Sequence, residues 1–346
     1  MTVLGDEVVG GVSVVFAGED YYQPFSWTSY GGLRVLGNSY ASDFATGVNN
    51  SGQIALTLQP SPGGPSQAYS RTGGQTPINL GTLGGLNSQT GGINNNGEIV
   101  GTSENSSGYS RAFSWTRSGG MVNLGTLNGF NESEASGVND SGQVVGDLAN
   151  AVTTGNTGPV HAFSYTPSGG MVDLGTLPGT VNSVAMAVNA SGEVVGDSSS
   201  HAVTGGSSLA FSWTSAGGMV NLGMLPGGGQ DTGATGINDN GVIVGTSAND
   251  AFIYENGKMT NLNTLVPANS VWHLFDAVAI TDNGDILADG YNTVTGSQDA
   301  LLLTAEFNPP SSVPDDTDSA KLLLGACGLL LLACSLIPRR PTQLAP

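Results

Sequence analysis

The chain has 346 residues, of which 54 are glycine and only 10% are charged, and its formal net charge is −19. Its eight lysines and arginines are too few to form a basic stripe that neutralises phosphates, which argues against a nucleic-acid-binding protein. The length allows a large hydrophobic core. The glycines recur at fixed places between apolar pairs, so they indicate turns and bulges rather than low complexity.

The two cysteines, Cys327 and Cys334, both lie in an apolar segment near the C-terminus. The rest of the chain therefore offers no disulfide framework, no paired-cysteine metal site and no thiol nucleophile. A cysteine-free body of this kind suits an oxidising compartment.

One block of sequence recurs along the chain about every 46 residues. The block joins three motifs in fixed order: A-F-S-W-T, G-G-M-V-N-L-G-T-L and A-x-G-I-N-x-x-G-x-V-V-G. Its first motif stands at Phe25-Ser26-Trp27, Ala68-Tyr69-Ser70, Ala112-Phe113-Ser114-Trp115, Ala162-Phe163-Ser164-Tyr165, Ala210-Phe211-Ser212-Trp213, Ala251-Phe252-Ile253-Tyr254 and, in degenerate form, Ala300-Leu301-Leu302-Leu303.

Four short strands are predicted in each unit, for example at residues 111–116, 121–124, 135–139 and 143–146. Gly142 suits the positive φ of the hairpin turn between the last two. Four antiparallel strands in a repeat of this length predict an all-β protein, a β-propeller with four-stranded blades.

The ends of the array predict how the ring closes. Residues 5–10 match the fourth strand of a unit, whereas residues 300–304 match the first. We therefore expect one blade to be shared between the two termini, giving about seven blades, with six as the alternative. Residues 1–10 have neither a basic region nor a separate apolar stretch, so the sequence also predicts a native N-terminus and a signal peptide further upstream.

Three regions follow from this pattern. Residues 1–306 are the predicted propeller, residues 307–319 a linker rich in proline, serine and aspartate, and residues 320–346 a single transmembrane helix with a basic tail. The apolar run extends from Leu322 to Ile337 and is followed by Arg339 and Arg340. It is shorter than the ~20 residues usual for a spanning helix, but it is apolar on all sides.

The repeats resemble the HAF family of extracellular repeat proteins, which is named for the tripeptide found here as His161-Ala162-Phe163. The tail resembles the C-terminal sorting signals of the PEP-CTERM class, in the variant that begins V-P-D-S-G. Here the motif is Val313-Pro314-Asp315-Asp316, so the serine and glycine of that variant are replaced. The resemblance implies export, an inner-membrane intermediate, processing by an exosortase-type enzyme and a final place at the surface of a Gram-negative bacterium or outside it.

The three histidines, His161, His201 and His273, lie in different units and have no metal-ligand spacing. Asparagine-rich turns recur at residues 94–97, 139–142, 238–241 and 282–284. Their oxygens could ligate calcium, but the turns are short and hold at most one carboxylate each, so hairpin turns explain them better. We assign no catalytic residue, no metal ligand and no cofactor site from the sequence.

Recurring side chains are predicted to be structural. The aromatic residues Trp27, Tyr69, Trp115, Tyr165, Trp213 and Tyr254 are taken to share one repeat position and to pack between blades, with sugar stacking as the alternative. Leu124, Leu174 and Leu222 should belong to the core. The acids Glu98, Glu193 and Asp285 share a strand position with Gln143 and Val242, which predicts solvent-facing rather than catalytic side chains.

Binding specificity is expected on the parts that vary between units, because loops tolerate change better than strands do. The longest variable loops are residues 147–160 and 197–208. Trp272, in the insertion 266–275, is the one aromatic residue outside the repeat register and is a candidate ligand contact.

The sequence favours an exported, non-catalytic surface protein that serves in adhesion. Binding to the extracellular matrix or exopolysaccharide is implied by the PEP-CTERM resemblance alone. Two alternatives remain open. One is an extracellular glycan-acting enzyme that uses the central channel of the propeller, and the other is a self-associating structural protein.

Overall fold

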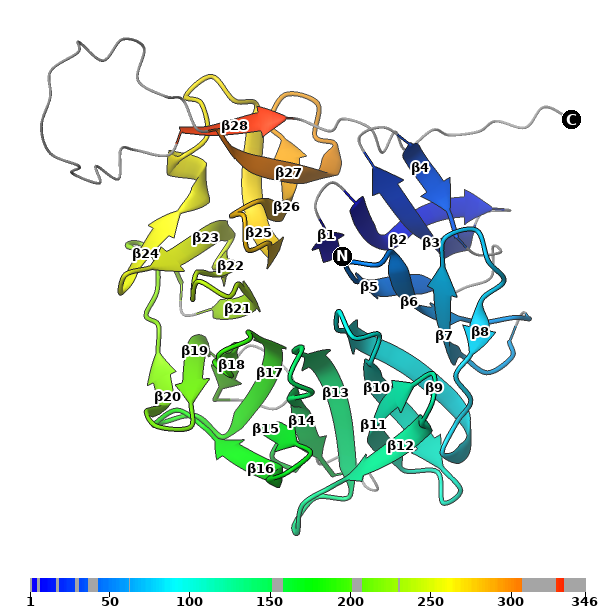
Figure 1. The fold of residues 1–346 in the computed structure, drawn as a ribbon. Helices are drawn as coiled ribbons and strands as arrows, with labels where there is room; N and C mark the ends of the chain where they lie inside the picture. The colour runs from blue at the N-terminus through cyan, green and yellow to red at the C-terminus, as the bar shows by residue number, and fades with distance from the viewer. Residues whose placement is uncertain are drawn as a thin grey trace, which may run out of the picture.

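The computed structural model describes residues 2–306, except 5–6, 17–18, 29–30, 37–42, 62, 151–157, 201–206 and 230, and also residues 328–332. These residues form seven four-stranded antiparallel sheets, each built from four strands consecutive in the sequence. The sheets stand around a centre as the blades of a propeller (Figure 1). The predicted fold class is confirmed, with seven blades rather than six.

The strands of the first four blades are β1 (Thr2–Leu4), β2 (Glu7–Phe16), β3 (Glu19–Thr28) and β4 (Gly32–Val35) in blade 1; β5 (Phe44–Val48), β6 (Gln53–Leu58), β7 (Gln67–Thr72) and β8 (Ile78–Asn79) in blade 2; β9 (Gly84–Ile93), β10 (Ile99–Asn105), β11 (Ser110–Thr116) and β12 (Gly120–Gly125) in blade 3; and β13 (Glu132–Val138), β14 (Val144–Ala149), β15 (His161–Thr166) and β16 (Gly170–Gly175) in blade 4.

The remaining strands are β17 (Asn182–Val188), β18 (Val194–Ser199), β19 (Ser208–Thr214) and β20 (Gly218–Asn221) in blade 5; β21 (Thr232–Ile237), β22 (Ile243–Ser247), β23 (Asp250–Glu255) and β24 (Lys258–Asn261) in blade 6; and β25 (Trp272–Ile280), β26 (Ile286–Asn292), β27 (Gln298–Glu306) and β28 (Gly328–Leu332) in blade 7. A short 3-10 helix, η1 (Leu262–Thr264), follows β24.

The A-x-G-I-N motif forms the first strand of a blade, so a blade begins in the middle of the repeat block as we defined it. These first strands contact one another around the centre, and β1 also contacts β25. The predicted blade shared between the termini is therefore wrong. The N-terminal segment supplies all four strands of blade 1, since β1 pairs with β2, and blade 7 is built from β25 to β28.

The C-terminal segment differs in part from the prediction. Residues 328–332, inside the predicted transmembrane helix, form β28 and pair with β27. No helix among the described residues is long and apolar enough to span a membrane. The sorting motif Val313-Pro314-Asp315-Asp316, the basic pair Arg339 and Arg340 and both cysteines lie outside the described residues.

Hydrophobic clusters lie between neighbouring blades. Leu174 and Leu177 of blade 4 pack with Phe211 of blade 5, and Leu222 and Leu225 of blade 5 pack with Phe252 of blade 6. Both phenylalanines are fully buried, and burying each contributes about 1.5–3 kcal/mol. Leu124 of blade 3 packs, partly buried, against the cluster that contains Phe163 of blade 4. The predicted core role of Leu124, Leu174 and Leu222 is therefore confirmed.

A line of buried asparagine amides connects six of the blades. Asn49, Asn94, Asn139, Asn189 and Asn238 end the first strands of blades 2 to 6, and each is at most 6% exposed. Their Nδ2 groups donate to the backbone carbonyl oxygens of Asn94, Asn139, Asn189, Asn238 and Thr281 in the next blade, at 3.0, 2.9, 2.8, 3.2 and 3.1 Å. We call these five bonds the asparagine ladder.

The Oδ1 atom of each ladder residue holds its own hairpin turn. In blade 4, Asn139 Oδ1 accepts the backbone N–H groups of Ser141 and Gln143 at 3.1 and 3.0 Å. The turn also has Gly142 at φ +78°, where residues with a Cβ are strained. One side chain thus shapes the turn and ties it to the next blade, which explains why G-I-N and a following glycine recur together.

We expect Asn139→Ala to reduce the free energy of unfolding by about 2–4 kcal/mol, because it removes the partners of three buried or partly buried backbone groups. Urea unfolding followed by circular dichroism would measure the change. The control is Ser141→Ala in the same turn, because the Ser141 hydroxyl bonds inside the turn, to Asn139 Oδ1, and its removal leaves the ladder bond intact. Equal losses in the two variants would contradict a special role for the ladder.

Candidate functional site

The antiparallel order of the blades gives the ring two different faces. The hairpin turns between first and second strands and between third and fourth strands lie on one face, which we call the turn face. The connections between second and third strands and between blades lie on the other, the loop face. The two longest variable loops belong to the loop face, and residues 151–157 and 201–206 within them lie outside the described residues.

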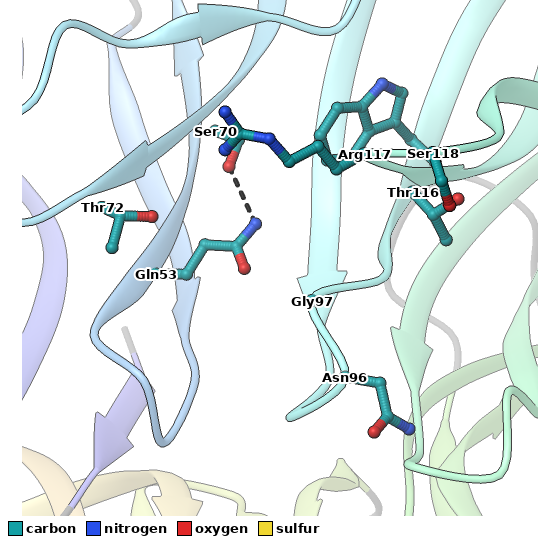
Figure 2. A pocket seen from close by; sticks show the side chains of 9 residues that line it. Gln53, Ser70, Thr72, Asn96, Gly97, Thr116, Arg117 and Ser118 are labelled. Atoms are coloured by element: carbon teal, nitrogen blue, oxygen red, sulfur yellow. Dashed lines mark hydrogen bonds between the residues drawn. The ribbon is translucent and has the colours of Figure 1, made fainter.

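A pocket of about 620 Å³ opens on the turn face between blades 2 and 3. This volume is within the range typical of small-molecule sites. Its lining combines hydroxyl, amide, aromatic and guanidinium groups: Gln53, Ser70, Thr72, Asn96, Gly97, Trp115, Thr116, Arg117 and Ser118 (Figure 2). We call it the seam pocket.

Gln53 forms the base of the seam pocket. Its Nε2 donates to Ser70 Oγ at 2.9 Å within blade 2, as the dashed line in Figure 2 shows. Its Oε1 faces blade 3, where a Cβ added to Gly97 would stand only 2.8 Å from it. Glycine at the hairpin of blade 3 therefore leaves room for the Gln53 amide, and the base of the pocket is neutral and polar.

Trp115 forms one wall and Arg117 the rim. Trp115 is 7% exposed and packs against Ala55 and Ala68 of blade 2, so only a small part of the indole meets the pocket. Arg117 follows β11 in an exposed turn, and its side chain extends in Figure 2 toward Ser70 across the seam. Arg117 has no ion pair or hydrogen bond among the described residues.

The same base position recurs at the other seams. The prediction that its side chains face solvent is wrong. Gln143 is 9% exposed and donates to Ser164 Oγ at 2.9 Å. Glu98 accepts the hydroxyl of Ser114 at 2.5 Å. These side chains alternate between carboxylate and amide because both can pair with the serine of A-F-S-W.

The other two acids at this position are also partly buried. Glu193 accepts a hydrogen bond from Ser212, as Glu98 does from Ser114. Asp285 is partly buried in blade 7, and burial raises its pKa. At Glu98, Gln143 and Glu193 the interchange therefore reflects a shared serine partner, whereas blade 7 has Leu302 in place of that serine.

The strand register corrects one aromatic assignment. Leu56 pairs with Tyr69 and Ile54 with Arg71, whereas Ile99 pairs with Trp115. Tyr69 therefore corresponds to the buried phenylalanine of other blades, and Arg71 takes the position of the tryptophan. Arg71 donates to the backbone oxygens of Leu36 at 2.7 Å and Gly73 at 3.2 Å.

The remaining aromatic residues at this position pack between blades as predicted. Trp27 contacts Leu287 and Leu302 of blade 7, and Trp213 packs against Val145 and Ala162 of blade 4. Tyr165 and Tyr254 pack partly buried in the clusters shared with the preceding blades.

The central channel is lined by the first strands of blades 2 to 7 and offers mainly glycine, threonine and aliphatic side chains. Two carboxylate pairs lie near it toward the loop face. Glu134 and Asp147 are cross-strand partners in blade 4, and Asp276 and Asp289 are partners in blade 7. Neither pair was predicted from the sequence, although an aspartate recurs at this register position as Asp147, Asp197 and Asp289.

Both pairs have carboxyl groups that hold their protons unusually tightly. Burial, with a further contribution from the charge of Glu134, raises the pKa of Asp147 to about 7. Burial raises the pKa of Asp276 to about 6, and the charge of Asp289 adds to this effect. Burial also raises the pKa of Glu134 and of Asp289. Such groups can donate or accept protons near neutral pH.

The described histidines have structural partners. His161 begins β15, and its Nδ1 lies 2.8 Å from Asp173 Oδ2. His273 Nε2 lies 2.9 Å from the backbone oxygen of Asn249 and 3.3 Å from Asp250 Oδ1. His201 lies outside the described residues. Among the described residues, no group of three or more histidine, cysteine or acidic side chains could hold a metal ion.

Trp272 begins β25 and packs, partly buried, against the core cluster of blades 6 and 7. It lies in a different blade from the seam pocket. The structure also places an aromatic stack beside it that the sequence did not suggest. His273 and Tyr291 have ring centroids 4.9 Å apart, and Phe275 stacks with Tyr291 at 6.4 Å.

The asparagine-rich turns are hairpin turns, as predicted. Residues 94–97, 139–142 and 238–241 each close with a backbone hydrogen bond from the glycine to the first asparagine, at 3.1, 3.0 and 3.0 Å. In residues 282–284 the glycine bonds to Thr281 instead, at 3.0 Å. The ladder oxygens that could ligate a cation accept backbone N–H groups.

Comparisons with known proteins add little beyond this geometry. No protein-family model matches the chain, and no curated protein matches it. Among solved structures, TolB from Acinetobacter baumannii is similar, with 12% identity and a TM-score of 0.49 over 86% of this chain. A mutant of AofleA from Arthrobotrys oligospora has 12% identity and a TM-score of 0.36, covering 75% of this chain and 82% of its own. The chain spans 63% of the TolB chain. Similarity this distant gives no information about the ligand or the activity of this chain.

The raised pKa of Asp147 predicts a pH-dependent stability. Its pKa is about 7 in the folded chain against 3.8 for an ordinary aspartate, so the folded state binds the proton more tightly. Ionisation therefore destabilises the fold as the pH rises from about 4 to about 7. We expect Asp147→Asn to melt at a higher temperature than the wild type at pH 8 and at a similar temperature near pH 4. Calorimetry at both pH values would measure this.

Thr102→Asn is the control, because Thr102 holds the same register position in blade 3 and carries no carboxylate. A pH-independent difference between Asp147→Asn and the wild type would contradict the assignment.

Proposed function

We propose that this protein is an exported, non-catalytic surface protein that binds extracellular polysaccharide, and that the seam pocket is its binding site. The observation that carries the proposal is the composition of that pocket, in which hydroxyl and amide groups from two blades surround one tryptophan edge. Such groups both donate and accept hydrogen bonds, which matches the hydroxyl groups of a sugar.

The departure of one seam from the repeat supports the same site. A scaffold shared by every blade gives every seam a similar wall, whereas binding needs groups that one seam alone supplies. The corresponding seam between blades 3 and 4 has Glu98 at its base and Pro167 at its rim, and the seam between blades 4 and 5 has Gln143 and Ser215. The seam pocket differs in its combination of Gln53 and Arg117.

Binding is tested with the full chain on immobilised and soluble bacterial exopolysaccharides, by co-sedimentation and calorimetry. We expect Gln53→Ala to weaken binding about threefold to tenfold, because one hydrogen-bonding group at the base is lost. The matched control is Gln143→Ala, which removes the same kind of serine bond within blade 4, at the seam with blade 5. Failure of the wild type to bind any polysaccharide would refute the proposal.

We further propose that the chain is a HAF-type repeat protein with a PEP-CTERM-type tail. In this proposal residues 322–337 insert in the membrane as a helix, and an exosortase-type enzyme cleaves near Val313 to Asp316. Insertion would require residues 328–332 to leave blade 7, because one segment cannot be both β28 and a spanning helix. In the native host, replacing the motif by alanines should increase the membrane-bound fraction, measured by fractionation and immunoblotting. An unchanged distribution would contradict sorting.

A glycan-cleaving enzyme is the second candidate, and the Glu134–Asp147 pair favours it. Glycoside hydrolases use paired carboxyl groups, one of which keeps its proton near neutral pH, and the raised pKa of Asp147, about 7, would suit that role. The full chain would be incubated with the polysaccharides that it binds, and new reducing ends would be counted. Cleavage that Asp147→Asn abolishes would establish the enzyme, whereas intact polymer would leave the non-catalytic proposal in place.

A further inference from the structure

We propose that the seam pocket selects acidic saccharides, with the Arg117 guanidinium binding the carboxylate of a uronic acid residue. This inference rests on the proposed function, since it names the class of sugar that the same pocket takes. It depends on three features of the molecule. Arg117 makes no hydrogen bond or ion pair within the described residues, the pocket lining has no carboxylate, and the following seams do not combine a neutral base with an arginine at the rim.

Arg117 is exposed and makes no ion pair or hydrogen bond within the described part of the chain. Arginine is rare in this protein, which has eight lysines and arginines against 27 acids. Arg71, by contrast, uses its guanidinium on backbone oxygens of Leu36 and Gly73. Arg117 therefore remains able to present a planar set of donors to a ligand carboxylate.

The pocket lining contains no carboxylate, and Arg117 is its one charged residue. The Glu98 side chain belongs to the neighbouring seam, where its Oε2 would lie 3.4 Å from a Cβ on Gly142 of blade 4. A bound anion would thus meet a cation at the rim and neutral groups at the base. The amide of Gln53 and the hydroxyl of Ser70 lie beside it for the ring hydroxyls, whereas Asn96 Nδ2 donates to the backbone oxygen of Asp140 in blade 4 at 2.7 Å.

The seams that follow along the ring lack this combination. Glu98 at the base between blades 3 and 4, and Glu193 between blades 5 and 6, would repel an anion. The seam between blades 4 and 5 has the neutral base Gln143, but its rim residue is Ser215. Among these seams, Arg117 is therefore found at the seam pocket alone.

The ligand is expected to be longer than one sugar. Arg34 of blade 1 reaches across the adjacent seam, where its Nη2 would lie 3.7 Å from a Cβ on Gly74 of blade 2, and Arg71 lies in β7 just before that turn. Arg34, Arg71 and Arg117 together extend positive charge over blades 1 to 3. A polyuronate chain carries a carboxylate on every residue and could place more than one of them along these blades.

The experiment is calorimetry of the full chain with trigalacturonate and with its methyl ester, in which the sugars are unchanged and the charges are removed. We expect the acid to bind more tightly, and its affinity to fall with added salt. Arg117→Ser, which copies the residue of blade 5, should weaken binding of the acid about tenfold and leave the ester unaffected.

Lys258→Ser is the matched control, because it removes one positive charge from the turn face of blade 6. An equal loss in both variants would overturn the assignment to Arg117 in favour of a general charge effect. If acid and ester bind equally and Arg117→Ser changes nothing, the acidic specificity is wrong while the polysaccharide-binding function stands. If no polysaccharide or oligosaccharide binds at all, the proposed function itself fails.

Discussion

The asparagine ladder is the interaction on which the rest of this propeller depends. Each ladder residue uses its carbonyl oxygen inside its own hairpin and its amide on the backbone of the next blade. A buried amide that loses such partners costs more than the bond itself contributes, so the hairpin and the spacing between blades are fixed together. The fully buried phenylalanines then fill the space that this spacing leaves.

The ladder has two ends within the described residues. In blade 7 its position is taken by Thr281, whose hydroxyl accepts the backbone N–H of Asp285 at 3.1 Å. Threonine has no side-chain amide that could donate to the next blade. In blade 1 the register places Val3 opposite Val8, and no asparagine stands at this point. Blade 1 is instead held to blade 7 by apolar contacts of Val8, Phe25 and Trp27.

Because the blades repeat, equivalent positions can be compared within this one chain. The serine of A-F-S-W accepts an amide at Gln53 and Gln143 and donates to a carboxylate at Glu98, and both arrangements keep the strands in place. Charge at the base of a seam can therefore change without damage to the fold. Among the seams compared, the seam pocket is where a neutral base and an arginine rim coincide.

Much of the fold could be predicted from the sequence, because the strands, turns and core leucines follow from local patterns that recur in each unit. The starting point of a blade could not, since a circular repeat has the same period wherever it is cut. The displaced register of Tyr69 and Arg71 was hidden for a similar reason: A-Y-S-R resembles A-F-S-W in its aromatic residue but not in the position of that residue.

The candidate site was less predictable than the fold. The seam pocket joins residues from strands and turns of two blades, and Gln53 and Arg117 are far apart in the sequence. The pairing of Glu134 with Asp147 depends on a strand register with a bulge between Ala135 and Gly137, which a regular alternation of side chains does not reveal. Single residues such as Trp272 attract notice in a sequence, whereas a site between repeats arises from positions that look ordinary in each repeat alone.

The acceptors of the ladder bonds are backbone carbonyl oxygens, which every amino acid possesses. A ladder bond can therefore form with any neighbouring blade, whereas the N–H group of the following residue, as at Asn95, is accepted by a side chain of that blade, Asp140. Gene duplication could lengthen such an array one unit at a time, and deletion could shorten it, with no change in the acceptors of the ladder bonds. The spacing of the amides would remain the same in rings of different size, so that the number of blades is set by how the outer sheets pack and not by the central bonds.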